Sequence, residues 1–210
     1  MGGSDGGRDV SRPPPRVLHW DDAHEHLSKA IAAPVPEAFP TRIIAITGPV
    51  GAGKSTLAQR LASNVLTTDA YLPDYSIVPY LERDDPAHAD LVLLAANLSE
   101  LRAGRPAEVP VWSFFTHRRE SMRTVHLDSV IAVEGLFALH ALVRPHIDVA
   151  VFVEAPSAIR WPRLEQREQA GERGWPLDHL REHFRDVAEP WFDRHAAEYR
   201  AAADFVVVND

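Results

Sequence analysis

One stretch of eight residues constrains the fold of this chain more than any other feature. Gly48–Ser55 reads Gly-Pro-Val-Gly-Ala-Gly-Lys-Ser and matches the pattern G-x-x-x-x-G-K-[ST]. An apolar β-branched run, Arg42–Thr47, precedes it, and a run that reads as a helix, Thr56–Ala62, follows it. Because the pattern requires a strand before it and a helix after it, we interpret Gly48–Ser55 as a loop that binds phosphate groups.

The residue types of this phosphate loop suit a nucleotide. Glycine allows successive backbone N–H groups to point at one anion, and the N-terminus of the next helix adds a favourable dipole. Lys54 brings a positive charge to the β- and γ-phosphates, and the Ser55 hydroxyl is a ligand for Mg²⁺. We expect the nucleotide to contact Gly48, Val50, Gly51, Ala52, Gly53, Lys54, Ser55 and Thr56.

The composition is that of an ordinary globular protein. A chain of 210 residues is long enough to bury a full core, and one α/β domain is expected. The formal net charge of −8 argues against a general binder of nucleic acids or membrane surfaces. The absence of cysteine excludes disulfides and thiol chemistry. Without a long apolar run or a signal peptide, the protein is expected in the cytoplasm.

The order of expected elements predicts a mostly parallel sheet. Residues 1–18 are expected to form a disordered tail, because their first part is rich in Gly, Ser and Pro, and residues 19–210 to form a single domain. We expect strands at 42–47, 65–68, 129–133, 149–153 and 205–208, and helices at 21–32, 56–62, 86–102, 157–169 and 177–203, the last broken near Pro190. The segment 109–115 contains Pro110 and is at best a short edge strand.

Acidic side chains follow two of the expected strands. Asp69 comes directly after 65–68, and Glu134 comes directly after 129–133. Ligands of parallel sheets lie at the carboxyl ends of the strands, where Lys54 and Ser55 also fall. Asp69 therefore suits a base that takes a proton from an attacking hydroxyl, and Glu134, with Ser55, suits a Mg²⁺ ligand. A turn residue at Asp69 and a surface carboxylate at Glu134 are the alternatives.

The segment 157–175 carries arginines that suit a lid over the phosphates. Arg160, Arg163 and Arg167 share one helix face, and Arg173 follows in a glycine-containing segment. Such charges would stabilise the transferred phosphoryl group, and the segment would close over the site. The alternative is a solvated face that pairs with neighbouring glutamates. Pro162 would strain a regular helix here, so the helix start is open.

Aromatic residues next to a histidine suit the wall of a pocket. Trp112–His117 reads Trp-Ser-Phe-Phe-Thr-His, in which the rings would face a planar ligand and His117 would hydrogen-bond it. Trp112 as a core residue and His117 as a structural histidine are the alternatives. The other histidines show no spacing typical of a zinc site.

Taken in order, the motifs resemble the uridine kinase branch of the phosphoribulokinase/uridine kinase superfamily. The resemblance covers about residue 42 to the C-terminus. It rests on the phosphate loop, Asp69-Ala-Tyr71, Asp84-Asp-Pro-Ala-His-Ala-Asp90, Gly104-Arg-Pro, Pro110-Val-Trp-Ser-Phe-Phe-Thr-His117, Val133-Glu-Gly135, Arg160-x-x-Arg163-x-x-x-Arg167-Glu168 and Glu172-Arg-Gly174. It implies a P-loop NTPase fold, a three-layer α/β sandwich with helices on both faces of the sheet and a helical lid.

The resemblance also implies an activity and a set of roles. The reaction would be MgATP plus a nucleoside giving ADP and a nucleoside monophosphate. Asp69 would activate the 5′-hydroxyl, Asp84 would bind ribose hydroxyls and His117 the pyrimidine base. The implied catalytic residues are Asp69, Lys54 and Arg163; Arg160 and Arg167 join the nucleotide site; and the substrate site holds Asp69, Tyr71, Asp84, Trp112, His117, Glu134, Arg160 and Arg173. Family members often assemble, so a homo-oligomer is possible.

Departures from the family pattern gather on the acceptor side. Trp112 replaces a usual tyrosine, Leu72 stands where an aromatic residue is common, and Trp175 replaces a usual arginine. Phosphoryl transfer to another small alcohol, such as pantothenate or a sugar, is therefore the main alternative. The other alternative is a protein that binds a nucleotide but phosphorylates no acceptor. A GTPase switch is disfavoured, because the chain has no Asn-Lys-x-Asp signature.

Overall fold

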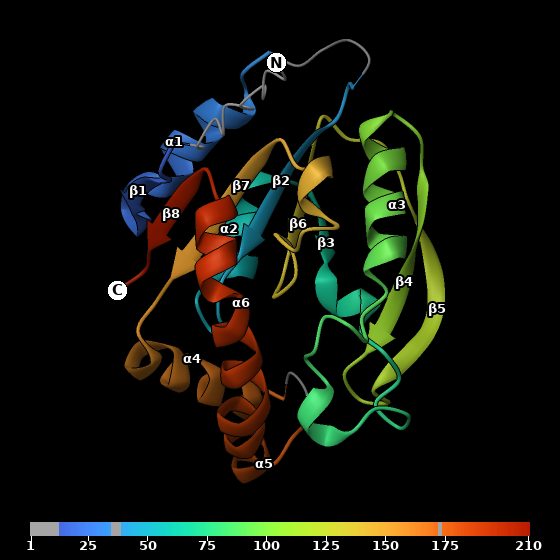
Figure 1. Cartoon of the computed structure of the whole chain (residues 1–210), viewed down its shortest axis with the longest axis vertical. Coiled ribbons are helices and arrows are strands. Elements are labelled where there is room, and N and C mark those ends of the chain that lie inside the picture. The colour runs from blue at the N-terminus through green and yellow to red at the C-terminus, as the bar shows by residue number, and fades with distance from the viewer. Residues whose placement is uncertain (1–12, 35–38, 172–173) are drawn as a thin grey trace, which may run out of the picture.

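The computed structural model describes residues 13–34, 39–171 and 174–210. Its centre is a six-stranded sheet in which every neighbouring pair of strands is parallel (Figure 1). Across the sheet the strands are β1 (Arg16–His19), β8 (Phe205–Val208), β7 (Val149–Glu154), β2 (Arg42–Thr47), β6 (Val130–Glu134) and β3 (Asn64–Thr67). The expectation of a mostly parallel α/β sheet is confirmed.

Helices cover both faces of this sheet. One face carries α1 (Trp20–Ile31) and α2 (Lys54–Leu61), and the other carries α3 (Leu91–Arg102) and α6 (Glu189–Ala202). Ile44 and Ile46 of β2 pack on the α1 and α2 side, while Ile43 and Ala45 pack on the other. Successive side chains of a strand point to opposite faces, so a strand covered on both sides is apolar throughout. The predicted three-layer sandwich is confirmed.

A two-stranded antiparallel hairpin lies beside the sheet. It consists of β4 (Ala107–Ser113) and β5 (Arg118–Val125), with Pro110 opposite Met122. The expectation of a short edge strand at 109–115 was wrong in extent, and β5 was not predicted at all. The reason is that seven of the eight β5 residues are exposed, so the strand lacks the alternating apolar pattern that reveals a half-buried strand.

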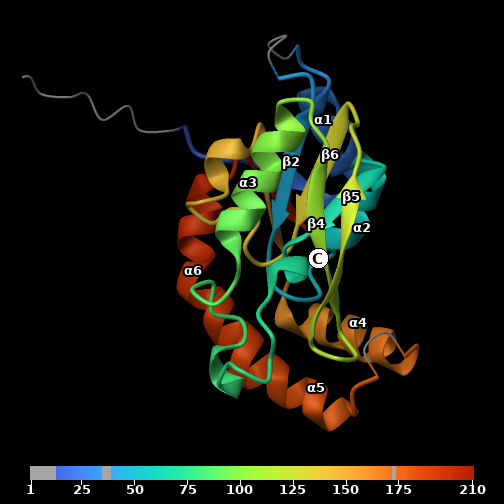
Figure 2. The same cartoon turned by 90° about the vertical axis from the view of Figure 1, so that its right-hand side faces the viewer.

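A group of helices after β7 lies at the carboxyl edge of the sheet, below it in Figure 2. It contains α4 (Ser157–Gln169), α5 (Leu177–His183) and the π-helical turn η4 (Phe184–Ala188), which runs into α6. Pro162 lies inside α4, yet the helix begins at Ser157 as expected. The expected break near Pro190 takes the form of η4, because the chain continues through the π turn without leaving the helical path.

The N-terminal part of the domain corrects one expectation. The predicted disordered tail included Arg16–Leu18, but these residues belong to β1, whose Arg16 and His19 lie opposite Phe205 and Val208 of β8. The pairing satisfies the otherwise open edge of β8, and Leu18 is buried against the core. A short local sequence does not reveal a strand whose partner lies almost two hundred residues away.

Short turns complete the described chain. The 3₁₀ turn η1 (Thr68–Tyr71) directly follows β3, η2 (Tyr80–Glu82) lies between η1 and α3, and η3 (Arg144–His146) precedes β7. The expected helix at 86–102 begins only at Leu91, where the Asp90 side chain accepts a hydrogen bond from the N–H of Leu93. Among the helices of the described residues, none has the length and apolarity needed to cross a membrane.

Candidate active site

The phosphate loop joins the end of β2 to the start of α2, and glycine is required at its close approaches. A side chain at Gly48, where φ is +151°, would place Cβ 2.3 Å from the backbone oxygen of Val153. At Gly51, where φ is +79°, Cβ would lie 2.9 Å from the backbone oxygen of Arg160. The loop therefore lies directly against the ends of β7 and α4, in a position that other residues would not allow.

Lys54 is a buried cation at the start of α2. Its Nζ donates a hydrogen bond to the backbone oxygen of Pro49 at 3.0 Å, which holds the side chain across the loop. Burial lowers the pKa of Lys54, and the nearby carboxylates of Glu134 and Asp69 oppose that shift. A group held in this way gains a strong partner when an anion enters the loop.

Glu134 ends β6 beside the loop. The residue is only 8% exposed, and the side chains of Ser55 and Thr67 act on its carboxylate to lower its pKa. Burial is the largest influence and raises the pKa of Glu134, although Lys54 acts in the opposite direction. A buried carboxylate near a hydroxyl on the loop has the chemistry of a ligand pair for a cation, the role that the sequence predicts for Glu134 and Ser55.

Asp69 lies in η1, directly after β3. Its backbone N–H donates a hydrogen bond to Oγ1 of Thr67 at 3.2 Å, which fixes the start of the turn. Asp69 lines the same cavity as Lys54 and Glu134, and its charge influences the pKa of both. The structure therefore places the two carboxylates and the lysine around one cavity, as their positions at the ends of strands predicted.

Arg160 has a different surrounding from the one expected. Its guanidinium donates to the backbone oxygens of Ala155 and Val50, both at 2.9 Å, and to the two carboxylate oxygens of Glu189 at 2.7 and 2.5 Å. The side chain is buried, and it ties α4 and α6 to the phosphate loop. The expected direct contact with nucleotide or substrate is not supported by this arrangement, since four of its five N–H donors are already used within the fold.

The remaining arginines of α4, Arg163 and Arg167, are more exposed than Arg160. Nη2 of Arg163 lies 3.3 Å from Oδ1 of Asn209, and the charge of Arg167 acts on Lys54. Arg167 lines the cavities on both sides of the loop, whereas Arg163 lines only one of them. The expected lid residue Arg173 lies outside the described residues.

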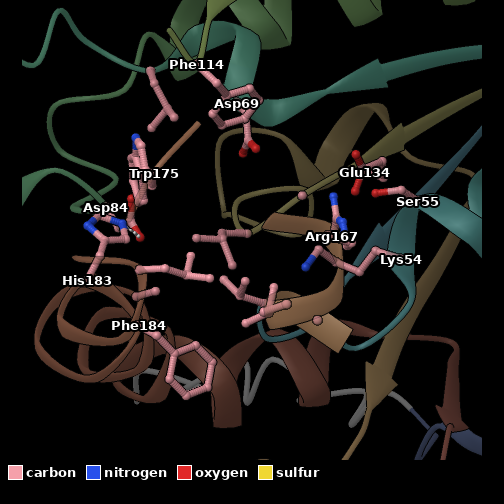
Figure 3. A pocket seen from close by; sticks show the side chains of 18 of the residues that line it. Lys54, Ser55, Asp69, Asp84, Phe114, Glu134, Arg167, Trp175, His183 and Phe184 are labelled. Carbon is pink, nitrogen blue, oxygen red and sulfur yellow. Dashed lines mark ion pairs between the residues drawn. The ribbon is translucent and has the colours of Figure 1, made fainter. Parts of the chain in front are cut away.

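Two cavities meet at the phosphate loop. The first cavity contains Asp69, Asp84 and Glu134 among its lining residues, and the second contains Gln59 and Arg163. They share Gly51, Lys54, Ser55 and Arg167. Figure 3 shows the first cavity with Lys54, Ser55, Glu134 and Arg167 at one end, Asp84, Trp175 and His183 at the other, and Asp69 between them. A group placed at the shared residues can be reached from both cavities.

Aromatic side chains form one wall of the first cavity. Tyr75, Phe114 and Trp175 line it. His117 does not, although the sequence predicted a direct role for it. Instead, Nε2 of His117 accepts a hydrogen bond from the indole N–H of Trp175 at 3.0 Å, and its ring stacks on Tyr75 at 5.4 Å. The histidine thus lies behind the wall and supports two of the rings that form it.

At the far end of the first cavity, Asp84 and His183 form a pair of which the sequence predicted only Asp84. Asp84 was predicted, and it lies with Oδ2 3.6 Å from Nε2 of His183, both side chains being 7% exposed. Among the described residues, Nδ1 of His183 has no hydrogen-bond partner. His183 was missed because nothing local distinguishes it from the other histidines of the chain. Its role depends on α5 turning it toward Asp84.

Two further predictions fall outside the first cavity. Tyr71 is buried in the core, where its hydroxyl accepts a hydrogen bond from Asn97 at 2.9 Å and burial raises its pKa to about 12. Trp112 is buried as well, and its indole N–H donates to the backbone oxygen of Pro73 at 3.1 Å. Neither lines the first cavity, but both line a neighbouring cavity that also contains Asp69 and Phe114, so their predicted contact with the substrate stays a prediction.

The oxygen atoms near the phosphate loop match the ligands that Mg²⁺ prefers. Within the described ranges, no set of three or more His, Asp and Glu side chains is arranged to hold a metal ion. Mg²⁺ commonly takes one or two carboxylates and completes its shell with phosphate oxygens and water. The Ser55 hydroxyl and the Glu134 carboxylate therefore fit a Mg²⁺ that arrives with the nucleotide, and not a cage made by the protein alone.

The chain is similar to several known proteins. Residues 78–209 match the Phosphoribulokinase / Uridine kinase family. The chain is 30% identical over 181 residues to the uridine kinase of Lactobacillus helveticus, covering 79% of this chain and 85% of that protein. It is 32% identical over 182 residues to the uridine kinase of Staphylococcus epidermidis, covering 80% and 87%. A possible uridine kinase from Bacillus stearothermophilus has the same fold, with a TM-score of 0.65, 19% identity and coverage of 89% and 98%.

Proposed function

The chain belongs to the phosphoribulokinase/uridine kinase family, and from this premise we propose that it phosphorylates the 5′-hydroxyl of a pyrimidine nucleoside. Membership identifies it as an ATP-dependent kinase that acts on a hydroxyl group. The arrangement of the two cavities carries the proposal. They meet at Lys54 and Ser55, and Asp69 lies on the side of the first cavity only.

ATP occupies the second cavity in this proposal, with its γ-phosphate at the shared residues. Backbone N–H groups of the loop and the ammonium of Lys54 bind the β- and γ-phosphates. Arg167 lines both cavities, so its positive charge can stay near the γ-phosphoryl group as that group passes from ATP to the acceptor. Arg163 lines the donor side, which supports its predicted role at the phosphates.

The acceptor occupies the first cavity and reacts beside Asp69. The carboxylate accepts the proton of the hydroxyl as the hydroxyl oxygen bonds to the γ-phosphorus. The bond between that phosphorus and the oxygen bridging to the β-phosphate breaks, and ADP leaves with the electron pair. Ser55 and Glu134 would hold Mg²⁺, which neutralises phosphate charge when it is bound. Ser55 and Glu134 line the first cavity together.

The walls of the first cavity support a nucleoside. Tyr75, Phe114 and Trp175 offer ring faces and edges to a planar base. At the far end, the Asp84 carboxylate, with His183 beside it, offers an acceptor to sugar hydroxyls. The combination of an apolar aromatic wall with a polar end is the chemistry that a base joined to a ribose requires.

A steady-state assay of Asp69→Asn with MgATP and uridine or cytidine tests the proposal. We expect kcat to fall by about 10²- to 10⁴-fold, because a general base is lost, while the Kd of ATP stays near its original value. Asp178→Asn is the matched control, since this carboxylate is 95% exposed on α5. Undiminished turnover in Asp69→Asn, with ATP bound normally, would remove Asp69 from the mechanism.

A second candidate acceptor is a small alcohol without a base. It is favoured by the Trp175–His117 hydrogen bond, which engages Nε2 of the histidine that the family resemblance assigned to a pyrimidine. A panel of uridine, cytidine, pantothenate, fructose and glycerate, each assayed by ADP release with MgATP, separates the two candidates. Selective turnover of the pyrimidine nucleosides supports the first proposal, and turnover of the other alcohols alone supports the second.

A further inference from the structure

The N-terminal strand and helix bring an aromatic residue to the phosphate loop. Because β1 is parallel to β8, its carboxyl end lies at the same edge of the sheet as the loop, and Figure 1 shows β1 beside β8 at that edge. His19 is the last residue of β1, and Trp20 follows it as the first residue of α1. The position of Trp20 is therefore decided by the pairing of β1 with β8.

Trp20 contacts the loop itself. A Cβ built at Gly53, where φ is +103°, would lie 3.0 Å from Cη2 of Trp20 and 2.7 Å from Nδ2 of Asn209. Asn209 in turn donates to the backbone oxygen of Ala52 at 2.8 Å and lies 3.3 Å from Nη2 of Arg163. The indole is only partly buried against the core. An aromatic ring and an amide thus flank the loop on the side of β8.

The direction in which the proposed ATP crosses the phosphate loop leads toward Trp20. The γ-phosphate lies at Lys54, where the two cavities meet, and Asp69 lies on the acceptor side. The rest of the nucleotide must extend away from Asp69 through the second cavity, whose lining continues from Gly53 and Thr56 to Gln59. Arg60, the neighbour of Gln59 on α2, holds its guanidinium 5.8 Å from the ring centre of Trp20. Trp20 therefore lies against Gly53, a residue that lines the second cavity, with the Arg60 guanidinium over its ring.

We propose that Trp20 forms part of the subsite for the donor's purine base, with the base stacking on the exposed part of the indole. Stacking on an aromatic ring requires only a planar π-system, and an indole can supply it without any base-specific hydrogen bond. Arg60 and Asn209 add a planar cation and an amide beside the same ring. This inference rests on the proposed direction of ATP across the loop. It assigns a binding role to a segment outside the resemblance on which the family roles were based.

The test separates base stacking from support of the loop. Trp20→Leu removes the aromatic ring and keeps an apolar side chain, and Trp20→Phe keeps a smaller ring. Binding of ATP and of inorganic tripolyphosphate, each with Mg²⁺, is measured on the full chain by calorimetry. We expect Trp20→Leu to weaken ATP about 10- to 100-fold, Trp20→Phe to recover much of the loss, and tripolyphosphate to bind all three proteins alike. Trp191→Leu on α6 is the matched control and should leave ATP binding unchanged.

Two results would overturn the inference. If Trp20→Leu weakened ATP and tripolyphosphate equally, the indole would only support the loop; if it weakened neither, the base would lie elsewhere. Photolabelling of the unaltered protein with 8-azido-ATP does not depend on how the variants fold. Label on the peptide that contains Trp20, displaced by ATP, supports the proposal, and label found only on other peptides contradicts it. Turnover of the acceptor panel by the unaltered protein reports separately on the proposed function.

Discussion

The indole N–H of Trp175 donates a hydrogen bond to Nε2 of His117 at 3.0 Å, and this bond joins the segment between α4 and α5 to the turn of the β4–β5 hairpin. His117 holds a left-handed backbone conformation with φ at 54°, which directs its ring toward Trp175. The backbone N–H of Trp175 also donates to the Glu168 carboxylate at 2.6 Å. The aromatic wall of the first cavity is thus held from two elements, α4 and the hairpin.

Breaking this bond should weaken the acceptor and spare the donor. Trp175→Phe keeps a ring in the wall but removes the N–H donor. The loss of one hydrogen bond, about 1 kcal/mol, should raise the acceptor KM about fivefold and leave the KM of ATP unchanged. Steady-state kinetics with each substrate varied in turn measure both values. Trp161→Phe on α4 provides the control, and an equal rise in both KM values would show that the bond has no selective effect on the acceptor.

Arg160 should be required for stability and for the shape of the loop. Arg160→Lys loses the paired hydrogen bonds to Glu189 and the donors to the backbone of Val50. Because the pair is buried, we expect the free energy of unfolding to fall by about 2–4 kcal/mol and ATP to bind more weakly.

Urea unfolding and ATP titration measure the two effects of Arg160→Lys. The matched control is Arg181→Lys, since the Arg181–Glu165 pair at 3.2 Å has an arginine side chain that is 56% exposed. Exposed pairs contribute at most about 1 kcal/mol, so this control should unfold almost like the original protein. Similar losses in the two variants would contradict the role assigned to Arg160.

Glu134→Gln should stabilise the nucleotide-free protein at neutral pH while reducing its activity. The folded-state pKa of Glu134 is raised above its unfolded value, so the ionised carboxylate costs stability once the pH exceeds the unfolded value of about 4.5. The amide removes that cost. We expect a higher Tm than the original protein at pH 7, with the difference shrinking as the pH falls toward 4.

Thermal melts across this pH range, without nucleotide, measure the effect of Glu134→Gln. The kinase rate at pH 7 should fall at the same time, because a proposed ligand of Mg²⁺ is lost. A lower Tm of the variant throughout the range would mean that the attraction of Glu134 to Lys54 outweighs its burial. That result would reverse the sign of our prediction.

The segment 157–175 should become more protected when both substrates bind. Arg163 and Arg167 line the second cavity and Trp175 lines the first, so filling both cavities should hold α4 more firmly. Amide hydrogen exchange with a non-hydrolysable ATP analogue plus uridine measures this protection, and α3 serves as an internal reference. Exchange in α4 that is unaffected by the ligands would rule out a moving lid.

The sequence revealed those parts of the site that depend on local order along the chain. A strand, a glycine-rich loop and a helix predict a phosphate site from their succession alone, and the carboxyl ends of parallel strands necessarily share one edge. Lys54, Ser55, Asp69 and Glu134 were therefore predicted together, and the structure places them around the cavity that their strand ends imply. The family resemblance added Asp84, which lines the same cavity.

Tertiary structure decided the parts that depend on which surfaces meet. Helical spacing predicted that Arg160 and Arg163 share a face, but only packing shows that Arg160 is occupied by Glu189 and the loop backbone. Tyr71 and Trp112 belong to conspicuous motifs, yet both are buried in the core, Tyr71 in the turn after β3 and Trp112 on β4 of the hairpin. His183 lies in no motif, and it reaches Asp84 only through the placement of α5.

By itself, then, the sequence determined the phosphate loop, the alternation of strands and helices, and the charged residues at the strand ends. Local patterns suffice there, since backbone geometry and a short spacing specify the chemistry. Only the tertiary structure decided the edge strand β1, the position of Trp20 and the Trp175–His117 bond. Each of these joins residues far apart in the chain, where contact depends on the packing of whole elements and not on any local pattern.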